Sequence, residues 1–158
     1  MLRKRPWNRI DMQIYSLSTK DDLVCNMNIC TYVSAVSLEN KKYMISVYKN
    51  TKTLENLQRT KRGLLQFLAK QHSAVVSRFG KQSGLKKDKL KNFQNKLHFL
   101  NGYAYLSDCL AVIELHVDEF IDVGDHILAL CTVQSFKNIS KGEGLMLSDL
   151  RKKGLVRV

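Results

Sequence analysis

The sequence has very little proline and no long hydrophobic run. Pro6 is the one proline in 158 residues, while hydrophobic residues make up 44% of the chain. This composition argues against long disordered linkers, and we expect a single domain over residues 1–158 with a proper core. No stretch reaches the roughly 18 apolar residues of a membrane-spanning helix. The N-terminus, MLRKRPWNRIDM, has basic residues with no apolar stretch behind them, unlike a secretory signal.

The chain also lacks the cysteine and histidine spacings of metal sites. Its cysteines, Cys25, Cys30, Cys109 and Cys131, form no C-x-x-C pair, and no Cys/His cluster has zinc-like spacing. Cys109 and Cys131 lie in apolar stretches, where a free cysteine behaves as a small hydrophobe. We therefore expect buried thiols in a reducing compartment, no disulfide and no metal. The chain is expected to be cytoplasmic and to make no membrane contact.

Common nucleotide-binding and catalytic patterns are missing too. The sequence contains no Walker A motif, no G-x-G-x-x-G and no G-x-S-x-G. GKQSG, which starts at Gly80, has two glycines and a lysine but neither nucleotide-binding spacing. No pair of carboxylates stands out, so the motifs offer no acid, base or nucleophile.

Positive charge is abundant, with a formal net charge of +12. The basic residues form scattered clusters at Arg3–Arg5, Lys41–Lys42, Lys86–Lys91 and Arg151–Lys153. No recognition helix, zinc finger or RNP pattern accompanies them, so we favour a solvated basic surface over a nucleic-acid site. A positive potential also attracts small polyanions such as phosphorylated cofactors.

Patterning predicts mostly strands. β-Branched and aromatic residues predict strands over 29–36 and 42–48, joined by a turn at Glu39–Lys41. A long strand is predicted over 103–120, and a further strand over 126–136 follows the turn at Asp122–Asp125. Strands in this arrangement, with helices in the middle of the chain, predict a small closed or half-closed barrel. The expected fold class is mainly β with flanking helices, an α+β fold.

The middle of the chain predicts helices. Leu54 and Leu57 lie on one face of an expected helix from Thr53 to Arg62, with Gly63 as its C-terminal stop. The apolar run 64–69 fits a strand or a helix, because periodicity does not separate the two over so short a stretch. A second helix is expected from Gln71 to about Phe79, and a loop from Gly80 to Lys89.

The stretch SVYKNTKTLENLQRTKRG, residues 46–63, joins a strand to a helix through polar residues. The N–H groups and partial positive charge of a helix N-terminus suit a phosphate, and Thr53 is a plausible N-cap. Lys49, Asn50 and Lys52 add donors just upstream. Taken alone, the stretch favours a simpler interpretation, in which Thr53 caps its own helix and the lysines face water.

Two further stretches are candidates. In NMNICTYVSAV, residues 26–36, Asn28, Thr31 and Ser34 interrupt an apolar strand, a pattern suited to a flat heterocycle. A strand with one wet face explains that pattern equally well. His126 opens a strand after Gly124–Asp125, and a lone histidine there is more often a surface residue.

Five stretches follow one another between residues 26 and 138: NMNICTYVSAVS, MISVYKNTKTLENL, FGKQSGLKKDKL, LNGYAYLSDCLAVIEL and VGDHILALCTVQSF. In this order the chain resembles the flavin reductase-like family of FMN-binding split β-barrel proteins. The Gly-Asp-His turn and the N-x-x-T strand are the most specific elements. The resemblance implies a homodimer of split barrels with one flavin per subunit near the interface.

The resemblance also implies roles for individual residues. The flavin ring would lie along Asn28, Ile29, Cys30, Thr31 and Tyr32. The ring edge and ribityl chain would be lined by Ser46, Val47, Tyr48, Lys49 and Asn50. The phosphate would be held by Asn50, Lys52 and Thr53, with Ser83, Gly84 and Lys89 close by. His126 matches a histidine beside the nicotinamide, and no catalytic residue is assigned.

The implied function is an NAD(P)H:flavin oxidoreductase that transfers hydride from NADH or NADPH to FMN, with FAD as another flavin. Many such reductases pass the reduced flavin to a monooxygenase or another electron acceptor. The alternatives are an FMN-binding electron carrier without nicotinamide activity and a basic nucleic-acid-binding module.

Overall fold

The computed structural model describes residues 5–156, so Arg3 and Lys4 of the first basic cluster lie outside the described residues. The chain is mainly strand with a few short helices, where η marks a 3-10 helix. In chain order the elements are η1 (Pro6–Asn8), β1 (Tyr15–Lys20), β2 (Cys25–Met27), β3 (Val33–Ser37), β4 (Lys42–Tyr48), α1 (Lys52–Thr60), β5 (Arg62–Phe67), η2 (Lys70–Val75), α2 (Val76–Lys81), η3 (Gln94–Lys96), β6 (Leu97–Leu100), β7 (Tyr103–Leu106), β8 (Ala111–Asp122), β9 (His126–Asn138) and α3 (Leu147–Lys152).

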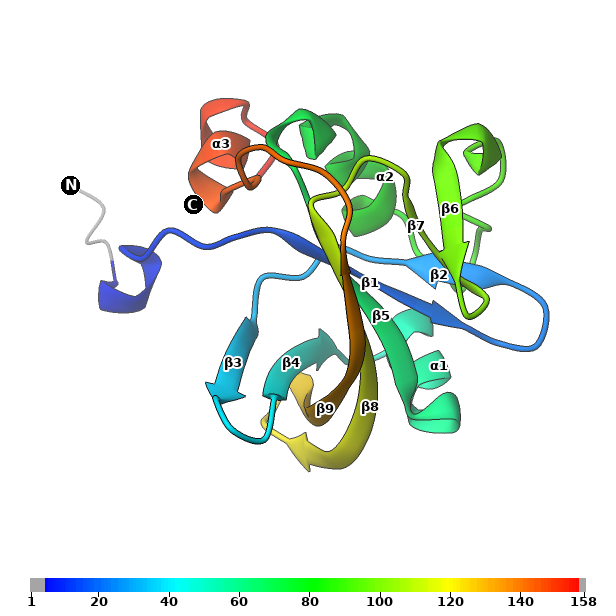
Figure 1. Cartoon of the computed structure of the whole chain (residues 1–158). Helices are drawn as coiled ribbons and strands as arrows, with labels where there is room; N and C mark the ends of the chain where they lie inside the picture. The colour runs from blue at the N-terminus through cyan, green and yellow to red at the C-terminus, as the bar shows by residue number, and fades with distance from the viewer. Residues whose placement is uncertain (1–4, 157–158) are drawn as a thin grey trace.

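One curled antiparallel sheet forms the body of the molecule. Its strand order is β2-β1-β5-β8-β9-β4-β3, and β6 and β7 form a separate hairpin. Figure 1 shows β8 and β9 bent at the lower end of the sheet, with α1 beside β5. Residues 28–32 cross from β2 to β3 and join the two sides of the sheet. Tyr15 and Cys30 exchange two backbone hydrogen bonds of 2.9 Å, and Ser46 N–H donates to the Tyr32 carbonyl at 2.9 Å. The expected barrel with flanking helices is therefore confirmed.

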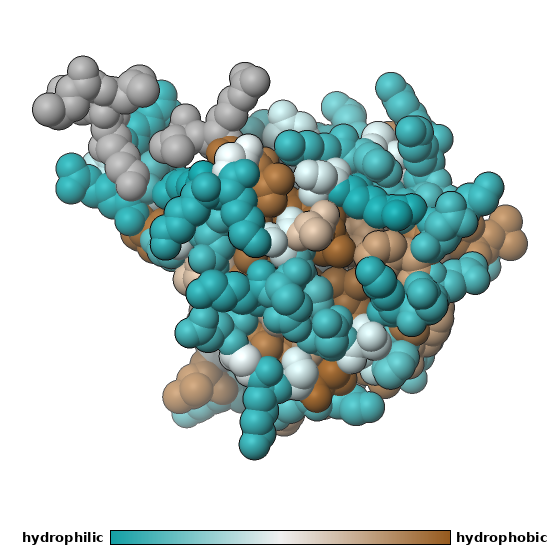
Figure 2. All heavy atoms as spheres, turned by 90° about the horizontal axis from the view of Figure 1, so that it is seen from above, coloured by the Kyte–Doolittle hydropathy of each residue, from teal (hydrophilic) through white to brown (hydrophobic). Residues whose placement is uncertain are grey.

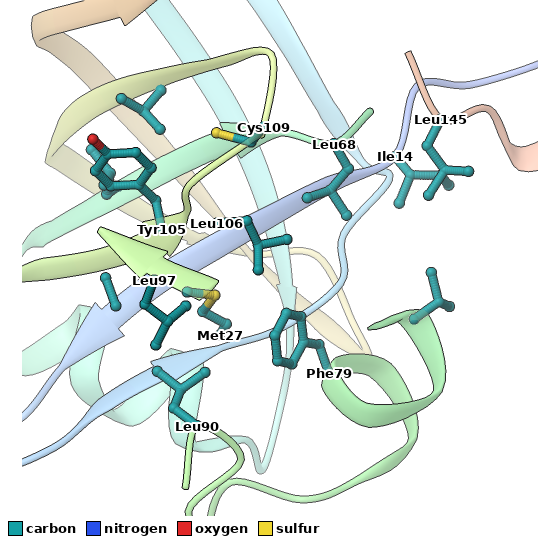
Figure 3. Close-up of a cluster of buried hydrophobic side chains, with 14 of the residues drawn as sticks. Ile14, Met27, Leu68, Phe79, Leu90, Leu97, Tyr105, Leu106, Cys109 and Leu145 are labelled. Carbon is teal, nitrogen blue, oxygen red and sulfur yellow. The ribbon is translucent and has the colours of Figure 1, made fainter. Parts of the chain in front are cut away.

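Two apolar clusters lie on opposite faces of this sheet. Inside the barrel, Leu17, Ile45 and Leu115 pack together, and α1 adds Leu54 and Leu57. On the other face, a second cluster lies between the sheet, the β6–β7 hairpin and α2. Figure 3 shows Met27, Leu106 and Phe79 of this second cluster pointing toward one another.

Two of the predicted strands are correct. The 42–48 prediction is confirmed as β4, and the 126–136 prediction is confirmed as β9. The 29–36 prediction is wrong in its first half, because residues 29–32 cross between two strands and regular pairing starts at Val33.

The continuous strand predicted over 103–120 is also wrong. The chain turns after Leu106, where Cys109 N–H donates to the Leu106 carbonyl at 3.1 Å. β7 then belongs to the separate hairpin with β6, and β8 starts at Ala111. All of β7 is buried.

The first helix ends earlier than predicted. Lys61 takes a left-handed conformation with φ 54° and its N–H donates to the Leu57 carbonyl, which ends α1 at Thr60. Gly63 is not the stop: it lies in β5, where an added Cβ would come within 3.0 Å of Leu17 Cδ1. The undecided run 64–69 is thus mostly strand. The second predicted helix is η2 followed by α2, which continues to Lys81.

The cysteines are free thiols. Cys30, Cys109 and Cys131 are buried as expected, and burial raises the pKa of each to about 12. Cys25 is only half-buried.

Hydrophilic side chains cover much of the face seen in Figure 2, with hydrophobic ones showing between them and at its edge. Among the helices described for residues 5–156, none is long and apolar enough to cross a membrane.

Candidate functional site

A cavity of about 580 Å³ lies where the crossing segment, the start of α1 and the loop after α2 meet. This volume is within the ~300–1,000 Å³ typical of cofactor sites. The sequence-predicted residues that line it are Asn28, Ile29, Cys30, Thr31, Tyr32, Ser46, Val47, Tyr48, Asn50, Lys52, Thr53, Ser83, Gly84, Lys89 and His126. Segments far apart in the sequence therefore converge on one space.

Lys49 does not belong to this lining. Its Nζ contacts both carboxylate oxygens of Asp122 at 2.8 Å, and it lines a separate surface depression. Lys49 follows Tyr48, which does line the cavity, and successive residues of an extended chain point to opposite sides. The assignment of Lys49 to the flavin is therefore corrected.

The N-terminus of α1 forms one end of the cavity. Thr51, not Thr53, is the N-cap: its Oγ1 accepts from Leu54 N–H at 3.3 Å. Asn50 precedes it with φ 58°, a left-handed conformation that asparagine tolerates. Lys52 and Thr53 are the first residues of the helix, and their N–H groups have no hydrogen-bond partner within residues 5–156. These N–H groups are the ones that bind anions at helix N-termini.

Two hydroxyl groups add donors at this end. Thr53 Oγ1 accepts a hydrogen bond from Asn26 Nδ2 at 3.0 Å, so its own hydrogen is left to donate. Ser83 Oγ accepts a hydrogen bond from Leu85 N–H at 3.3 Å, so its own hydrogen is likewise left to donate. The side chain of Lys52 is already occupied, because it pairs with Glu55 at 3.1 Å and Asp21 at 3.2 Å. Hydrogen bonds to Glu55 and Asp21 raise the pKa of Lys52, which stays charged.

Lys89 supplies a buried positive charge at the same end. The residue is 5% exposed, and its Nζ donates to the carbonyls of Met27 and Phe79, each at 2.8 Å. An ammonium group has three hydrogens, so one donor is left. Burial lowers the pKa of Lys89 to about 8. No carboxylate of residues 5–156 forms an ion pair with it, so an anion in the cavity would be its counter-charge.

The crossing segment forms one wall of the cavity and has available backbone donors. Cys30 N–H and carbonyl bond to Tyr15, which directs the N–H groups of its neighbours Ile29 and Thr31 away from β1. Neither of those N–H groups has a partner in the described part of the chain. The Asn28 side chain binds the crossing segment to β1, since its Oδ1 accepts a hydrogen bond from Leu17 N–H at 2.9 Å.

Three aromatic rings lie at the other end of the cavity. His126 and Tyr48 are opposite each other on β9 and β4, with ring centroids 4.9 Å apart, and Tyr32 lies 5.4 Å from His126. His126 Nδ1 lies 2.8 Å from Asp125 Oδ1. The Asp125 carboxylate accepts this bond, which lowers its pKa, and His126 Nε2 has no hydrogen-bond partner among residues 5–156.

Sequence reasoning missed several lining residues, namely Asn26, Thr51, Phe79, Gly80, Lys81 and Gln82. Thr51 had a local signal, because it lies between a strand and a helix. Phe79 to Gln82 had none, because only the packing of α2 against Ile29 brings them to the cavity: Ile29 Cγ1 would lie 3.4 Å from an added Cβ on Gly80.

A curled antiparallel barrel with a cavity at the N-terminus of a helix is the fold of flavin reductase-like split-barrel proteins. The chain belongs to the flavin reductase-like domain family, whose sequence model matches residues 7–155. This family is one of flavin-related oxidoreductases, and the predicted resemblance is confirmed.

Known proteins similar to this chain agree with that placement. A candidate diflavin flavoprotein of Nostoc sp. is 26% identical over 147 residues, covering 92% of this chain. The chain spans only 25% of the length of that relative.

Solved structures share the fold at low sequence identity. An FMN-binding protein from Thermus thermophilus has a TM-score of 0.76 at 18% identity, covering 87% of this chain and 76% of its own. The flavin reductase of the styrene monooxygenase from Pseudomonas putida S12 has a TM-score of 0.73 at 17% identity. The match covers 87% of this chain and 86% of that protein. A homologue of nitrilotriacetate monooxygenase component B from Mycobacterium thermoresistibile has a TM-score of 0.78 at 18% identity. The match covers 90% of this chain and 79% of that protein.

Proposed function

We propose that this chain is an NAD(P)H-dependent flavin reductase that binds FMN in the cavity. The observation that carries this proposal is the convergence, on one end of the cavity, of donors that have no partner among residues 5–156. The terminal phosphate of FMN would lie against Lys52 N–H, Thr53 N–H and the Lys89 ammonium. Asn50 and the hydroxyl groups of Thr53 and Ser83 would complete this end.

The ring would lie along residues 28–32, with Ser46 to Tyr48 at its edge. Ile29 and Thr31 N–H groups are placed to donate to the pyrimidine part of a flavin, where negative charge grows on reduction. FMN supplies the redox chemistry when bound, as an acceptor of hydride from NADH or NADPH. The protein's tasks are to align the two rings and to exclude water, which explains why no acid, base or nucleophile is visible in the sequence.

The aromatic end of the cavity would receive the nicotinamide. Replacing His126 by alanine is expected to raise the apparent KM for the nicotinamide about tenfold, a loss of about 1.4 kcal/mol, while FMN affinity is kept. Steady-state kinetics and FMN titration measure the two effects separately. His98→Ala is the matched control, because the exposed His98 also makes an edge contact with a tyrosine, Tyr105, at 5.9 Å. Equal KM values for wild type and His126→Ala would remove the nicotinamide role.

The electron acceptor of the reduced flavin is proposed by analogy with one structural neighbour. One structural neighbour is named as the flavin reductase of a styrene monooxygenase, which supports a monooxygenase or similar electron acceptor for this chain. Free thiols fit a reducing, cytoplasmic location, which is part of the proposal.

We also propose that residues 1–158 act as one domain and pair as a homodimer. Val36, Leu38 and Phe136 are 49%, 95% and 68% exposed and line one shallow apolar groove with Tyr43 and Ile113. Exposed apolar patches of this kind are typical of interaction surfaces. Phe136→Asp should shift the protein from dimer to monomer in analytical ultracentrifugation, and a monomeric wild type would contradict the pairing.

The direct test of function is an anaerobic visible spectrum of the protein with one equivalent of FMN, before and after NADH or NADPH. Bleaching of the flavin band faster than with free FMN is expected. A bound flavin that neither dinucleotide reduces would instead identify an electron carrier. A flavin spectrum identical to that of free FMN, with nucleic-acid affinity that falls steeply with salt, would favour the basic binding module.

A further inference from the structure

Lys89 lies on a loop that regular secondary structure does not fix. Residues 82–93 contain no helix or strand. Lys89 is nevertheless buried, and its Nζ donates to the carbonyls of Met27 and Phe79. Removing an ammonium group from water costs free energy unless its surroundings compensate. Contacts made by the loop backbone are therefore needed to keep Lys89 from turning out to solvent.

Arg78, on α2, makes such contacts. Its Nε donates to the Lys89 carbonyl at 2.9 Å, and its Nη2 donates to the Lys91 carbonyl at 2.7 Å. The planar guanidinium group thus binds the loop backbone at Lys89 itself and two residues further on. Arg78 directly precedes Phe79, whose carbonyl accepts from Lys89 Nζ. One turn of α2 therefore binds both the backbone and the side chain of Lys89.

Leu90 adds an apolar contact between the two bound carbonyls. It is 7% exposed and belongs to the second cluster, where Figure 3 shows it below Met27. Its own backbone bonds, with the Asp88 carboxylate and with Phe93 N–H, join loop residues only to one another. A leucine side chain forms no hydrogen bond, so it does not set the direction of the carbonyls on either side. The two donors of Arg78 do.

The charged groups around Lys89 do not take over this task. No carboxylate of residues 5–156 forms an ion pair with Lys89. The nearby Asp21 pairs with Lys52 at 3.2 Å instead. Asp88 Oδ1 accepts from Leu90 N–H at 2.9 Å. An adjoining space of about 160 Å³ is lined by Lys89 and by the titratable groups of Asp21, Cys25, Lys52, Lys87 and Asp88, and α2 adds Lys81 on the cavity side.

We propose that Arg78 is the residue that positions Lys89 for the flavin phosphate. This inference rests on the proposed function. Arg78 does not line the cavity and reaches the ligand only through the loop, so it is a positioning residue. Without its two hydrogen bonds the loop is expected to move and Lys89 to gain contact with water.

The test is FMN binding as a function of pH, with wild type, Arg78→Lys and Arg78→Met as full chains. The FMN affinity of wild type should fall as the pH rises through about 8, because burial lowers the pKa of Lys89 to that value. A hydrated lysine keeps its ordinary pKa of 10.5. In both variants the fall should therefore move upward by about one pH unit or more.

At pH 7 both Arg78 variants should bind FMN about threefold to tenfold more weakly than wild type, because a charged hydrogen bond to the phosphate is loosened and not removed. Arg78→Lys keeps a positive charge near Lys89 but does not reproduce the two-pronged contact of arginine. The same shift in both variants would thus show that the hydrogen bonds, and not the charge, position Lys89.

Lys96→Met is the matched control. Lys96 Nζ and Arg78 Cζ both lie 5.3 Å from the centre of the Phe93 ring, but the Lys89 and Lys91 carbonyls bind Arg78 and not Lys96. This variant should keep the wild-type pH profile. A midpoint that stays near pH 8 in both Arg78 variants would overturn the inference while leaving the flavin site intact. An equal shift in Lys96→Met would overturn it too.

A second measurement needs no flavin. NMR titration of the lysine side chains in the flavin-free protein gives the pKa of Lys89, with Lys89→Met to assign its signal. A pKa near 8 in wild type that rises in both Arg78 variants is expected. The same pKa in all three proteins would overturn the inference. If wild type binds no FMN, the proposed function fails, and this titration still decides whether Arg78 positions Lys89.

Discussion

Replacing Lys89 by methionine is expected to weaken FMN binding about tenfold to a hundredfold at pH 7. A hydrogen bond to a charged group contributes about 1.5–3 kcal/mol, and each 1.4 kcal/mol is a factor of ten. Lys89 is buried, has one donor beyond those used by Met27 and Phe79, and lines the phosphate end. Methionine keeps most of the side-chain volume and removes only the charge and the donors.

The same variant should lose the pH dependence of binding. Burial lowers the pKa of Lys89 to about 8 from the ordinary value of 10.5, so the free protein loses this charge as the pH rises through about 8. FMN affinity of wild type should therefore fall between pH 7 and about pH 9, whereas that of Lys89→Met should not show this fall.

As the pH rises, the free energy of unfolding of the flavin-free protein should change in the direction opposite to the FMN affinity. The unfolded chain binds more protons than the folded one between pH 8 and 10.5, so the free energy of unfolding should rise with pH across this window. Below pH 8 Lys89 is charged in both states, so the cost of burying its charge is fully present and stability does not vary with pH through this group.

Absorbance titrations with FMN at both pH values measure the binding effects. Lys86→Met is the control, because Lys86 lies on the same loop but is exposed and does not line the cavity. If Lys89→Met binds FMN as tightly as wild type does, the phosphate does not contact this lysine.

The second large effect concerns stability. Phe79→Ala is expected to lower the free energy of unfolding by about 3–5 kcal/mol, the usual cost of removing a buried aromatic ring. Phe79 is 1% exposed, and its ring makes an edge contact with Phe93 at a centroid distance of 5.6 Å. Figure 3 shows it pointing into the cluster beside Met27.

Urea denaturation of Phe79→Ala and of a matched control measures this effect. Phe99→Ala removes a ring of the same kind that is 61% exposed, and surface changes usually cost within about 0.5 kcal/mol. A loss below about 1 kcal/mol in Phe79→Ala would mean that α2 does not pack on the core as described. Because Phe79 also lines the cavity, weaker FMN binding should accompany the lost stability.

Strand prediction succeeded where the local pattern matches the environment of the strand. β4 and β9 are rich in β-branched residues and pair with each other, so their pattern alone locates them. The break between β7 and β8 was missed because both halves are apolar and neither contains proline or glycine. Ser107 and Asp108, which are turn-prone residues, were the available local signal.

The site could be located from the sequence only through the order of its stretches. Nothing local distinguishes Lys89 from its neighbours in KKDKLK, since its burial depends on contacts with Met27 and Phe79 from distant segments. The same holds for Asn26, whose partner Thr53 lies 27 residues away. The predicted N-cap, Thr53, was wrong by two residues, since the Thr51 side chain accepts the hydrogen bond from Leu54 N–H.

The most direct test of the flavin site is a crystal structure of the protein with FMN. The ring should lie along residues 28–32, and the phosphate should contact Lys52 N–H, Thr53 N–H and Lys89 Nζ. FMN bound outside this cavity, or bound with its phosphate at the Tyr32, Tyr48 and His126 end, would contradict the assignment.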